Sequence, residues 1–180
     1  MSARRRVLCL SGSLRRLSSN TAALQAAQQL APASLELVLY EGLGTLPLFN
    51  PDDEIEPLPD AVIALRKAVS EADALLIACP EYAHGVPGAF KNLLDWLVGS
   101  LEFPSKPVLM LNVSGRGSHH AQDALSEILR TMSANLLALR PFEVGLLGAG
   151  CRAEQVLASA ERCMELRSAL AHLAAAPITA

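Results

Sequence analysis

Ala74-Leu75-Leu76-Ile77-Ala78-Cys79 is an unbroken apolar run that ends at Pro80. A strand that is apolar at every position, rather than at alternate positions, is typical of a parallel sheet covered on both faces. Val7–Leu10 is a second such run, and it ends in the small residues Ser11-Gly12-Ser13. Both runs therefore predict central strands of a sheet that has helices on either side.

Apolar runs alternate with helical periodicity along the rest of the chain. The predicted strands are Val7–Leu10, Leu35–Tyr40, Ala74–Cys79, Val108–Val113 and Phe142–Leu147. Three helices are predicted by range, namely Thr21–Leu30, Ala89–Val98 and Ala153–Ala175. Between the first two ranges, Val62, Leu65 and Val69 mark another helix, with Asp60 as its N-cap. A further helix is marked by Ala121, Leu125, Ile128, Leu129 and Met132. This alternation predicts an α/β fold, a doubly wound five-stranded parallel sheet in the order 2-1-3-4-5 with helices on both faces. Because no repeat or linker interrupts it, residues 1–180 are expected to form a single domain.

Composition narrows the classes of function. With 180 residues, of which 51% are hydrophobic and 18% charged, the chain can bury a core and is unlike a disordered protein. The net charge of −3 lacks the basic surplus of a nucleic-acid binder, so no nucleic-acid partner is expected. No apolar run reaches the roughly 18 residues that cross a bilayer, so no membrane partner is expected either.

The N-terminus and the cysteines bear on the cellular compartment. Arg4-Arg5-Arg6 precedes an apolar stretch too short for the h-region of a signal peptide, and these arginines are expected to form a solvated end. Cys9, Cys79, Cys151 and Cys163 show no C-x-x-C spacing, so neither a zinc site nor a dithiol motif is predicted. The patterns around Cys9, Cys79 and Cys163 suit buried free thiols, which favours a reducing, cytoplasmic location.

The order of the sheet predicts where a ligand binds. In doubly wound sheets, ligands lie beyond the carboxyl ends of the strands, at the switch point between strands 1 and 3. Three loops follow the central strands there: Ser11–Asn20, Pro80–Gly88 and Ser114–His120. We therefore expect the functional residues in these loops.

The first loop reads Ser11-Gly12-Ser13-Leu14-Arg15-Arg16-Leu17-Ser18-Ser19-Asn20 and leads into a predicted helix. Free backbone N–H groups and the helix dipole favour an anion at that point, and the serine hydroxyls and Arg15 can donate to a phosphate. The alternative is a polar loop whose Ser and Asn side chains only cap the helix. The loop has neither G-x-x-x-x-G-K-[ST] nor G-x-G-x-x-G, so it is neither a triphosphate P-loop nor the usual dinucleotide fingerprint.

The second loop, Pro80-Glu81-Tyr82-Ala83-His84-Gly85-Val86-Pro87-Gly88, contains two prolines and two glycines. Such a path is stiff, and its backbone can approach a flat ligand closely. Tyr82 and His84 are candidates to line that ligand. The alternative is a rigid turn that precedes a helix with Trp96 in the core.

Together, GSLRRLSSN after the first strand and PEYAHGVPGAFKNLLDW after the third resemble the NAD(P)H-dependent FMN reductase family. That family includes flavodoxin-like quinone, azo-dye and chromate reductases. The spacing of the two motifs, the intervening segment Leu46–Asp52 and the chain length also match. The resemblance covers roughly the first two-thirds of the chain, and the last third matches only as a generic α/β pattern.

The resemblance implies a flavodoxin-like fold, bound FMN, and NADPH or NADH as electron donor. It implies that the FMN phosphate is held by Ser13, Arg15, Ser18 and Asn20, with Ser19. The isoalloxazine would lie along Pro80, Glu81, Tyr82, Ala83 and His84, and a third flavin loop would comprise Ser114, Gly115, Arg116 and Gly117. The family often has Asn at position 83 and Ser at position 85, so Ala83 and Gly85 imply that two side-chain contacts are missing.

Several other residues have both a functional and a structural interpretation. His119-His120 lacks nearby ligands of metal-site spacing, so no metal is predicted, and the pair is interpreted as loop surface or part of an acceptor pocket. Glu81 is a candidate acid or base, with an ion pair or cap within its loop as the favoured alternative. For Cys79, a buried thiol is favoured over a redox role. Ser11-Gly12-Ser13 is not the G-x-S-x-G of a hydrolase.

The sequence therefore predicts an FMN-dependent NAD(P)H oxidoreductase that passes two electrons to a small acceptor. The acceptors that the resemblance suggests are quinones, azo compounds, nitro compounds, metal oxyanions and free flavin. The flavin would carry the hydride, so no catalytic side chain is assigned. A flavodoxin-type electron carrier and a non-catalytic FMN-binding regulatory protein remain as alternatives.

A homodimer or homotetramer is implied by the resemblance, since members of the family commonly complete the flavin pocket with a neighbouring subunit. The predicted third helix and its flanks also carry more apolar side chains than one sheet face needs: Phe90, Leu93, Leu94, Trp96, Leu97, Leu101 and Phe103. Some of this stripe would then form a surface patch.

Overall fold

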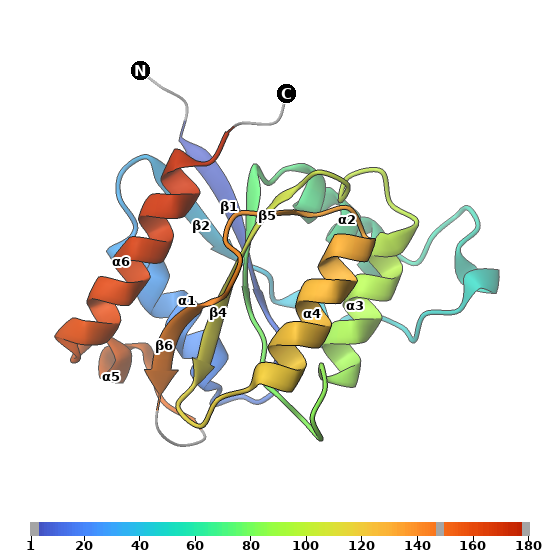
Figure 1. Ribbon diagram of the computed structural model, residues 1–180. Coiled ribbons are helices and arrows are strands. Elements are labelled where there is room, and N and C mark those ends of the chain that lie inside the picture. Colours follow the sequence, from blue (N-terminus) through green and yellow to red (C-terminus); the bar gives the residue numbers. More distant parts are fainter. Residues whose placement is uncertain (1–3, 147–149, 178–180) are drawn as a thin grey trace.

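The computed structural model describes residues 4–146 and 150–177, and its centre is a parallel β-sheet (Figure 1). Four strands lie side by side in the order β2, β1, β3, β4, and both β5 and β6 pair with β4. The predicted order 2-1-3-4-5 is confirmed, with one additional strand. The bounds are β1 Arg5–Ser11, β2 Leu35–Leu39, β3 Ala74–Ala78, β4 Pro107–Ser114, β5 Asn135–Leu136 and β6 Phe142–Leu146.

Helices cover both faces of the sheet, as the continuous apolar strands predict (Figure 1). On one face lie α1 (Ser19–Leu30), α5 (Ala153–Leu157) and α6 (Ala160–Ala175). On the other lie α2 (Asp60–Ser70), α3 (Gly88–Val98) and α4 (His119–Thr131). Two short 3-10 helices, η1 (Gly42–Thr45) and η2 (Pro51–Asp53), interrupt the connection between β2 and α2.

Alternate side chains of each central strand belong to different halves of the core. In β1, Val7 and Cys9 pack with the α1 and α6 side, whereas Leu8 and Leu10 pack with the α2 and α3 side. Successive side chains of a strand point to opposite faces, so a strand covered on both faces is apolar at every position.

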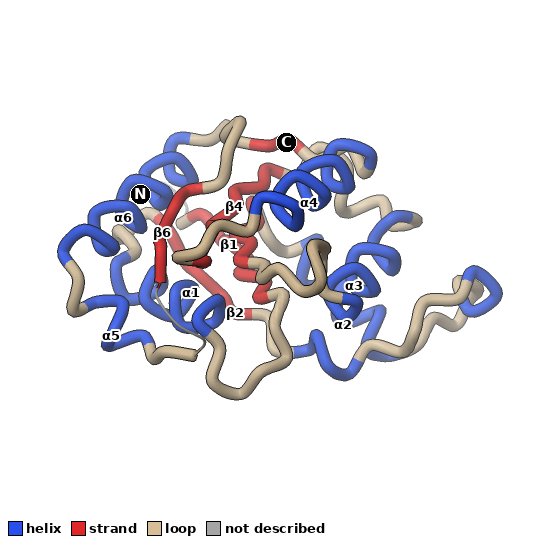
Figure 2. Tube along the Cα trace, turned by 60° about the horizontal axis from the view of Figure 1, so that its bottom comes forward, coloured by secondary structure: helices blue, strands red, loops and turns tan. Residues whose placement is uncertain are grey.

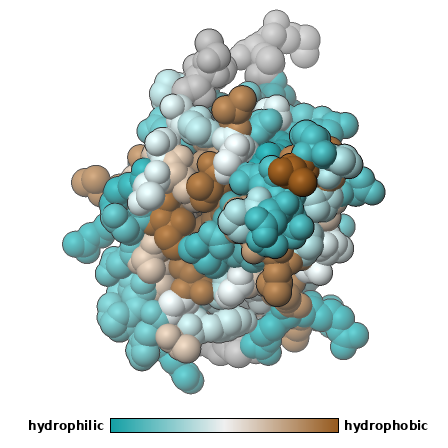
Figure 3. Space-filling model, turned by 90° about the vertical axis from the view of Figure 1, so that its right-hand side faces the viewer, coloured by the Kyte–Doolittle hydropathy of each residue, from teal (hydrophilic) through white to brown (hydrophobic). Residues whose placement is uncertain are grey.

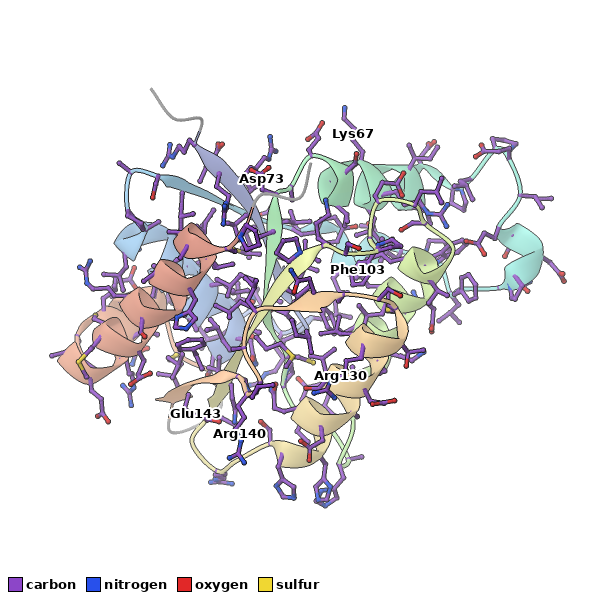
Figure 4. All side chains as sticks on the ribbon, turned by 45° about the horizontal axis from the view of Figure 1, so that its top comes forward. Lys67, Asp73, Phe103, Arg130, Arg140 and Glu143 are labelled. Carbon is purple, nitrogen blue, oxygen red and sulfur yellow. The ribbon has the colours of Figure 1, made fainter. Side chains whose placement is uncertain are left out.

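Two short strands, rather than the single predicted strand Phe142–Leu147, occupy the fifth position of the sheet. β5 pairs with the beginning of β4, and β6 pairs with its end. Between them the chain leaves the sheet, where Leu139 is 94% exposed and Pro141 has no N–H to donate to a neighbouring strand (Figure 4 labels the adjacent Arg140). β6 ends at Leu146, and Leu147 lies outside the described residues.

Three details near helix ends differ from the sequence-based expectations. The last predicted helix is two helices, because the Ser159 side chain accepts a hydrogen bond from the N–H of Arg162 and starts α6. Asp60 is the first residue of α2 and not its N-cap, which is Pro59. Arg5 is not part of a solvated end, since it lies in β1 and its guanidinium donates to two carbonyls at the end of α6.

An arm, residues 46–58, projects from the side of the molecule beside α2 and α3 (Figure 1). Its base is tied to α3, because the indole N–H of Trp96 and the amide of Asn92 both donate to the Pro47 carbonyl, at 2.8 and 2.9 Å. Its far side is tied to α2 through Glu54, whose carboxylate pairs with Arg66 of that helix at 2.6 Å. Trp96 is fully buried, as the structural interpretation of its segment predicts.

Most of the apolar stripe predicted for the third helix is core and not surface. Of its seven members only Leu101, just beyond α3, is exposed, and the other six are buried against the sheet. The most exposed apolar side chains on this side include Val98 and Leu101 near the end of α3, and Leu48 and Ile55 on the arm. Seen from this side, apolar areas lie among polar ones (Figure 3).

Candidate active site

The three predicted loops meet at the carboxyl edge of the sheet. Figure 2 turns this edge toward the viewer and shows the loops gathered around the strand ends. A cavity of about 340 Å³ lies between them, which is within the size range of small-molecule and cofactor sites. It is lined by Ser13, Arg15, Ser18, Ser19, Asn20, Pro80, Glu81, Tyr82, Val113, Ser114, Gly115, Arg116, Gly117, Leu146 and Gly150.

The first loop presents polar groups at the N-terminal end of α1. The buried Ser18 is the N-cap, and its hydroxyl accepts a hydrogen bond from the N–H of Thr21 at 3.4 Å. The hydroxyl of Ser13 accepts from the N–H of Arg15 at 3.3 Å, and the Arg15 side chain is exposed. Capping and cavity lining therefore occur together in this loop, and the two interpretations of it do not exclude each other.

Asn20 is the residue of this loop that fits a ligand most directly. It lines the cavity, is only 8% exposed, and its Oδ1 atom has no hydrogen-bond partner among the described residues. A buried amide oxygen without a partner is unfavourable, by about 1–3 kcal/mol. A polar ligand in the cavity would supply the missing partner.

Gly12 allows the first and second loops to approach each other. A Cβ atom at this position would lie 2.9 Å from the Cys79 sulfur and 3.1 Å from the Pro80 ring. Only glycine fits this distance without a shift of the neighbouring strand end. Burial raises the pKa of the Cys79 thiol to about 12, so this cysteine is a protonated packing residue and not a redox group at neutral pH.

The second loop forms a tight turn whose two central residues are not part of the cavity lining. Tyr82 and Gly85 exchange backbone hydrogen bonds of 3.1 and 3.0 Å, and Ala83 and His84 between them have φ values of +50° and +58°. Pro80, Glu81 and Tyr82 line the cavity, whereas Ala83 and His84 do not. The left-handed backbone gives a physical reason for the asparagine that is frequent at position 83 in the family, because Asn tolerates this conformation better than Ala.

Glu81 holds this loop against α4. One carboxylate oxygen accepts a hydrogen bond from the N–H of Ala121 at 2.9 Å, and the other lies 3.4 Å from Nδ1 of His84. The hydrogen bond from Ala121 lowers the pKa of the Glu81 carboxyl, and attraction to His120, His84 and His119 lowers it further, while desolvation opposes both. An ionised, hydrogen-bonded carboxylate agrees with the cap and ion-pair interpretation of Glu81, although the capped helix is α4 and not part of its own loop.

The third loop is anchored by a buried amide. Asn112 of β4 accepts hydrogen bonds from the Ser118 hydroxyl at 2.6 Å and the Ser114 N–H at 3.1 Å. Its own amide donates to Glu143 of β6 at 3.2 Å (Figure 4 labels Glu143). Asn112 is 4% exposed and Ser118 is 2% exposed, so the bond between them is shielded from water. Together these bonds fix both ends of the loop Ser114–Ser118.

Sequence reasoning missed three lining residues: Val113, Leu146 and Gly150. The N–H of Gly150 donates to the Ser19 hydroxyl at 3.1 Å, and its φ of +95° is one that glycine adopts without strain. The glycines at positions 148 and 150, which follow the last predicted strand, were the available signal for a fourth loop at this edge.

The charges of the cavity suit an anionic ligand. Among its lining residues Arg15 and Arg116 are cationic and Glu81 is anionic, and the Glu81 carboxylate is already hydrogen-bonded. Serine hydroxyls and the start of a 12-residue helix add further donors to the same wall. A phosphate at the first loop and a polar, flat ring between the second and third loops match this donor set, so the residues present fit FMN.

Comparison with known proteins shows the family of the chain. The family model of the NADPH-dependent FMN reductases matches residues 5–142. The chain belongs to this family. It is 41% identical over 128 residues to an NAD(P)H-dependent FMN reductase of Pseudomonas aeruginosa. This aligned region covers 69% of this chain and 69% of the relative. It is 34% identical over 152 residues to a quinone reductase of Escherichia coli K12, which covers 82% of this chain and 81% of the relative.

The fold agrees with the family assignment. The fold is similar to the solved structure of FerB, a flavoenzyme NAD(P)H:(acceptor) oxidoreductase from Paracoccus denitrificans, with a TM-score of 0.72 and 24% sequence identity. The match covers 94% of this chain and 97% of FerB. The predicted flavodoxin-like fold is confirmed. The chain is an FMN-dependent oxidoreductase that uses a reduced nicotinamide dinucleotide, as the sequence predicts.

None of the helices described is both long and apolar enough to span a membrane. Within residues 4–146 and 150–177, no group of His, Cys, Asp and Glu side chains is arranged to hold a metal ion.

Proposed function

We propose that the cavity holds FMN at the switch point of the sheet and that the enzyme reduces a small quinone. The observation that carries this proposal is that both family motifs and the third loop line one cavity with two arginines. The FMN phosphate lies against the first loop, and the flavin ring lies between the second and third loops. The quinone is favoured over the other acceptors because curated relatives of this chain are named quinone reductases.

Each loop has a separate task in this proposal. Ser13, Arg15, Ser18, Ser19 and Asn20 hold the phosphate end through hydroxyl, amide and guanidinium donors. Pro80, Glu81 and Tyr82 border one side of the flavin ring, and Ser114, Gly115, Arg116 and Gly117 border the other. Ala83 and His84 form the centre of the turn and lie outside the cavity lining.

FMN, when bound, accepts a hydride from the nicotinamide and delivers two electrons to the acceptor. No side chain of this chain needs to act as acid or base. Glu81, which lines the cavity, stays ionised and hydrogen-bonded to α4 because the pKa of its carboxyl is lowered. The contribution of the protein is to bind and orient the reactants and to exclude water from the ring.

Two neighbouring arginines provide a matched test of the phosphate position. Arg15 and Arg16 are both exposed and carry the same charge, but only Arg15 lines the cavity. Arg15→Ala is expected to weaken FMN binding about tenfold. This is the lower end of the range of affinity losses for a charged hydrogen bond, because the Arg15 side chain is in contact with solvent. Arg16→Ala should leave the affinity close to that of the wild type. Equal losses in both variants would mean that net charge, and not a contact at Arg15, governs binding.

The acceptor is tested by steady-state kinetics with a benzoquinone, an azo dye and free FMN as alternative acceptors. The proposal expects the highest kcat/KM for the quinone. A higher value for free FMN or the azo dye would assign a different acceptor to the same site.

A homo-oligomer is part of the proposal. Four apolar side chains are more than half exposed on one side of the molecule: Leu48 and Ile55 at 84% and 68%, Val98 and Leu101 at 63% and 93%. The arm and the end of α3 are close together, since a Cβ atom at Gly99 would clash with the Glu54 carboxylate. This patch suits burial against a second copy. A mass near 19.1 kDa by light scattering at micromolar concentration would contradict it.

A cytoplasmic location is the last part of the proposal, and the free thiols support it. None of the four cysteines forms a disulfide, and two of them are buried beside the sheet. Such thiols are typical of a reducing compartment. Recovery of the protein in the soluble cytoplasmic fraction of its cells is expected, and recovery in an oxidising compartment would contradict this part.

A further inference from the structure

Three of the four histidines of the chain form a cluster at the edge of the cavity. His84 comes from the turn after β3, and His119 and His120 begin α4. The ring centroid of His120 lies 4.4 Å from that of His84 and 4.0 Å from that of His119. Glu81 connects this histidine cluster to the cavity, since it lines the cavity and its carboxylate lies 3.4 Å from His84.

The histidine cluster lies outside the lining of the cavity that we propose for FMN. None of the three histidines lines the cavity, and all three are exposed. Among the described residues, no group of His, Cys, Asp and Glu side chains is arranged to hold a metal ion. The cluster therefore lies next to the cavity, beside Glu81, with all three side chains exposed to solvent.

The charges around the cluster favour an anion. Histidine gains a positive charge between pH 8 and pH 5, and the start of the 13-residue helix α4 adds a positive helix end. Arg116, in the loop before α4, is a further cation. The opposing charges are Glu81, which the Ala121 N–H also holds, and Asp123, which helix geometry puts one turn after His119 and His120.

We propose that the histidine cluster binds a phosphate group of the nicotinamide dinucleotide. This inference rests on the proposed function. A ligand that reaches both the cavity and the cluster must be long and must carry its anionic group away from its reacting ring. The dinucleotide has this form, with the nicotinamide ring at one end and the pyrophosphate, and in NADPH also a 2′-phosphate, farther along. A small quinone is short and uncharged.

Calorimetric titration of the FMN-loaded protein with NADP⁺ and with NAD⁺, at pH 6 and pH 8, tests this site. The wild type is expected to bind NADP⁺ about three- to tenfold more tightly at pH 6 than at pH 8. The factor is small because interactions between exposed charges are weak. The double variant His119→Gln/His120→Gln should lose this difference and bind weakly at both pH values. The fourth histidine, His172, lies on α6 on the opposite face of the sheet, so His172→Gln is the matched control and should behave as the wild type.

The two nucleotides distinguish the two phosphates. Weaker binding of both NADP⁺ and NAD⁺ to the double variant assigns the pyrophosphate to the cluster, and weaker binding of NADP⁺ alone assigns the 2′-phosphate. Unchanged binding of both nucleotides, with the pH difference retained, would overturn the inference. His84→Gln tests the same site from the second loop. FMN affinity is measured first in each variant, so that failure of the wild type to bind FMN would count against the proposed function and not against the cluster.

Discussion

Replacement of Asn112 by alanine should separate the third loop from the sheet and weaken FMN binding. The variant loses the acceptor for the Ser118 hydroxyl and the Ser114 N–H and the donor to Glu143. Because Ser118 is 2% exposed, its hydroxyl is left without water, whereas Ser114 is partly exposed and is solvated in part. A buried group without a partner costs about 1–3 kcal/mol, which applies to the Ser118 hydroxyl, and the partly solvated Ser114 N–H costs less. The unfolding free energy is therefore expected to fall by about 2–4 kcal/mol.

The assays are urea denaturation of the apoprotein and titration of FMN by quenching of its fluorescence. FMN affinity should fall about tenfold, because the residues between the two anchored ends, Ser114–Gly117, line the cavity. Ser126→Ala is the control, since this buried hydroxyl donates to the Gln122 carbonyl within α4 and does not line the cavity. It should lower stability by about 1 kcal/mol and leave FMN affinity unchanged.

Two results would refute this reasoning. If Asn112→Ala lost stability and bound FMN as tightly as the wild type, the buried amide would stabilise the core without positioning the loop. If stability did not change either, the three hydrogen bonds would contribute nothing. Asn112→Asp adds a further comparison, because it keeps the acceptor but sets a carboxylate against Glu143 at 3.2 Å. Its stability should be lower at pH 7 than that of the wild type and should approach it as the pH falls and the carboxylates are protonated.

Further outcomes follow from single contacts. Gly12→Ala should destabilise the fold by about 1–3 kcal/mol in urea denaturation, and the added substitution Cys79→Ala should restore part of this loss by removing the sulfur at 2.9 Å. Ala83→Asn should raise the unfolding free energy by about 0.5–1 kcal/mol, since φ is +50° there; a decrease would show that the turn is unstrained. Cys9 and Cys79, whose thiol pKa burial raises to about 12, should not react with a thiol reagent at pH 8 until the protein is denatured. The folded Glu81 carboxyl has a lowered pKa, so its stabilising effect is present above about pH 4.3, the unfolded value, and is lost as the pH falls through the folded one. The stability difference between wild type and Glu81→Ala should therefore shrink between pH 5 and pH 3.

The sequence predicts the central strands well because their burial on both faces leaves a continuous apolar run. Val7–Leu10 and Ala74–Cys79 correspond to β1 and β3 within a few residues. The loops of the site follow directly, since the order of a parallel sheet determines which strand ends meet. The two-residue strand β5 is too short to leave a pattern of its own, and its pairing with β4 depends on a tertiary contact.

Contacts between distant segments account for what the sequence does not predict about the site. Glu81 and Ala121 are 40 residues apart, and the fold alone brings the carboxylate to the N–H of α4. The same contact brings His84 next to His120, which itself lies against His119. His84 is far from the other two histidines in the sequence, so the sequence does not indicate that the three meet. Asn112 did leave a signal, as the polar residue in the apolar run of the fourth strand, but its partners became visible only in the structure.

Anaerobic reduction of the FMN-loaded protein by NADPH, and separately by NADH, tests most directly that this chain is a flavin-dependent reductase. The flavin absorbance near 450 nm, an expectation from the chemistry of FMN, should be lost within seconds and should return when a quinone is added. FMN that binds but is not reduced by either nucleotide would contradict the reductase and favour an electron carrier or a regulatory protein. A protein that does not bind FMN would contradict the assignment of the cavity.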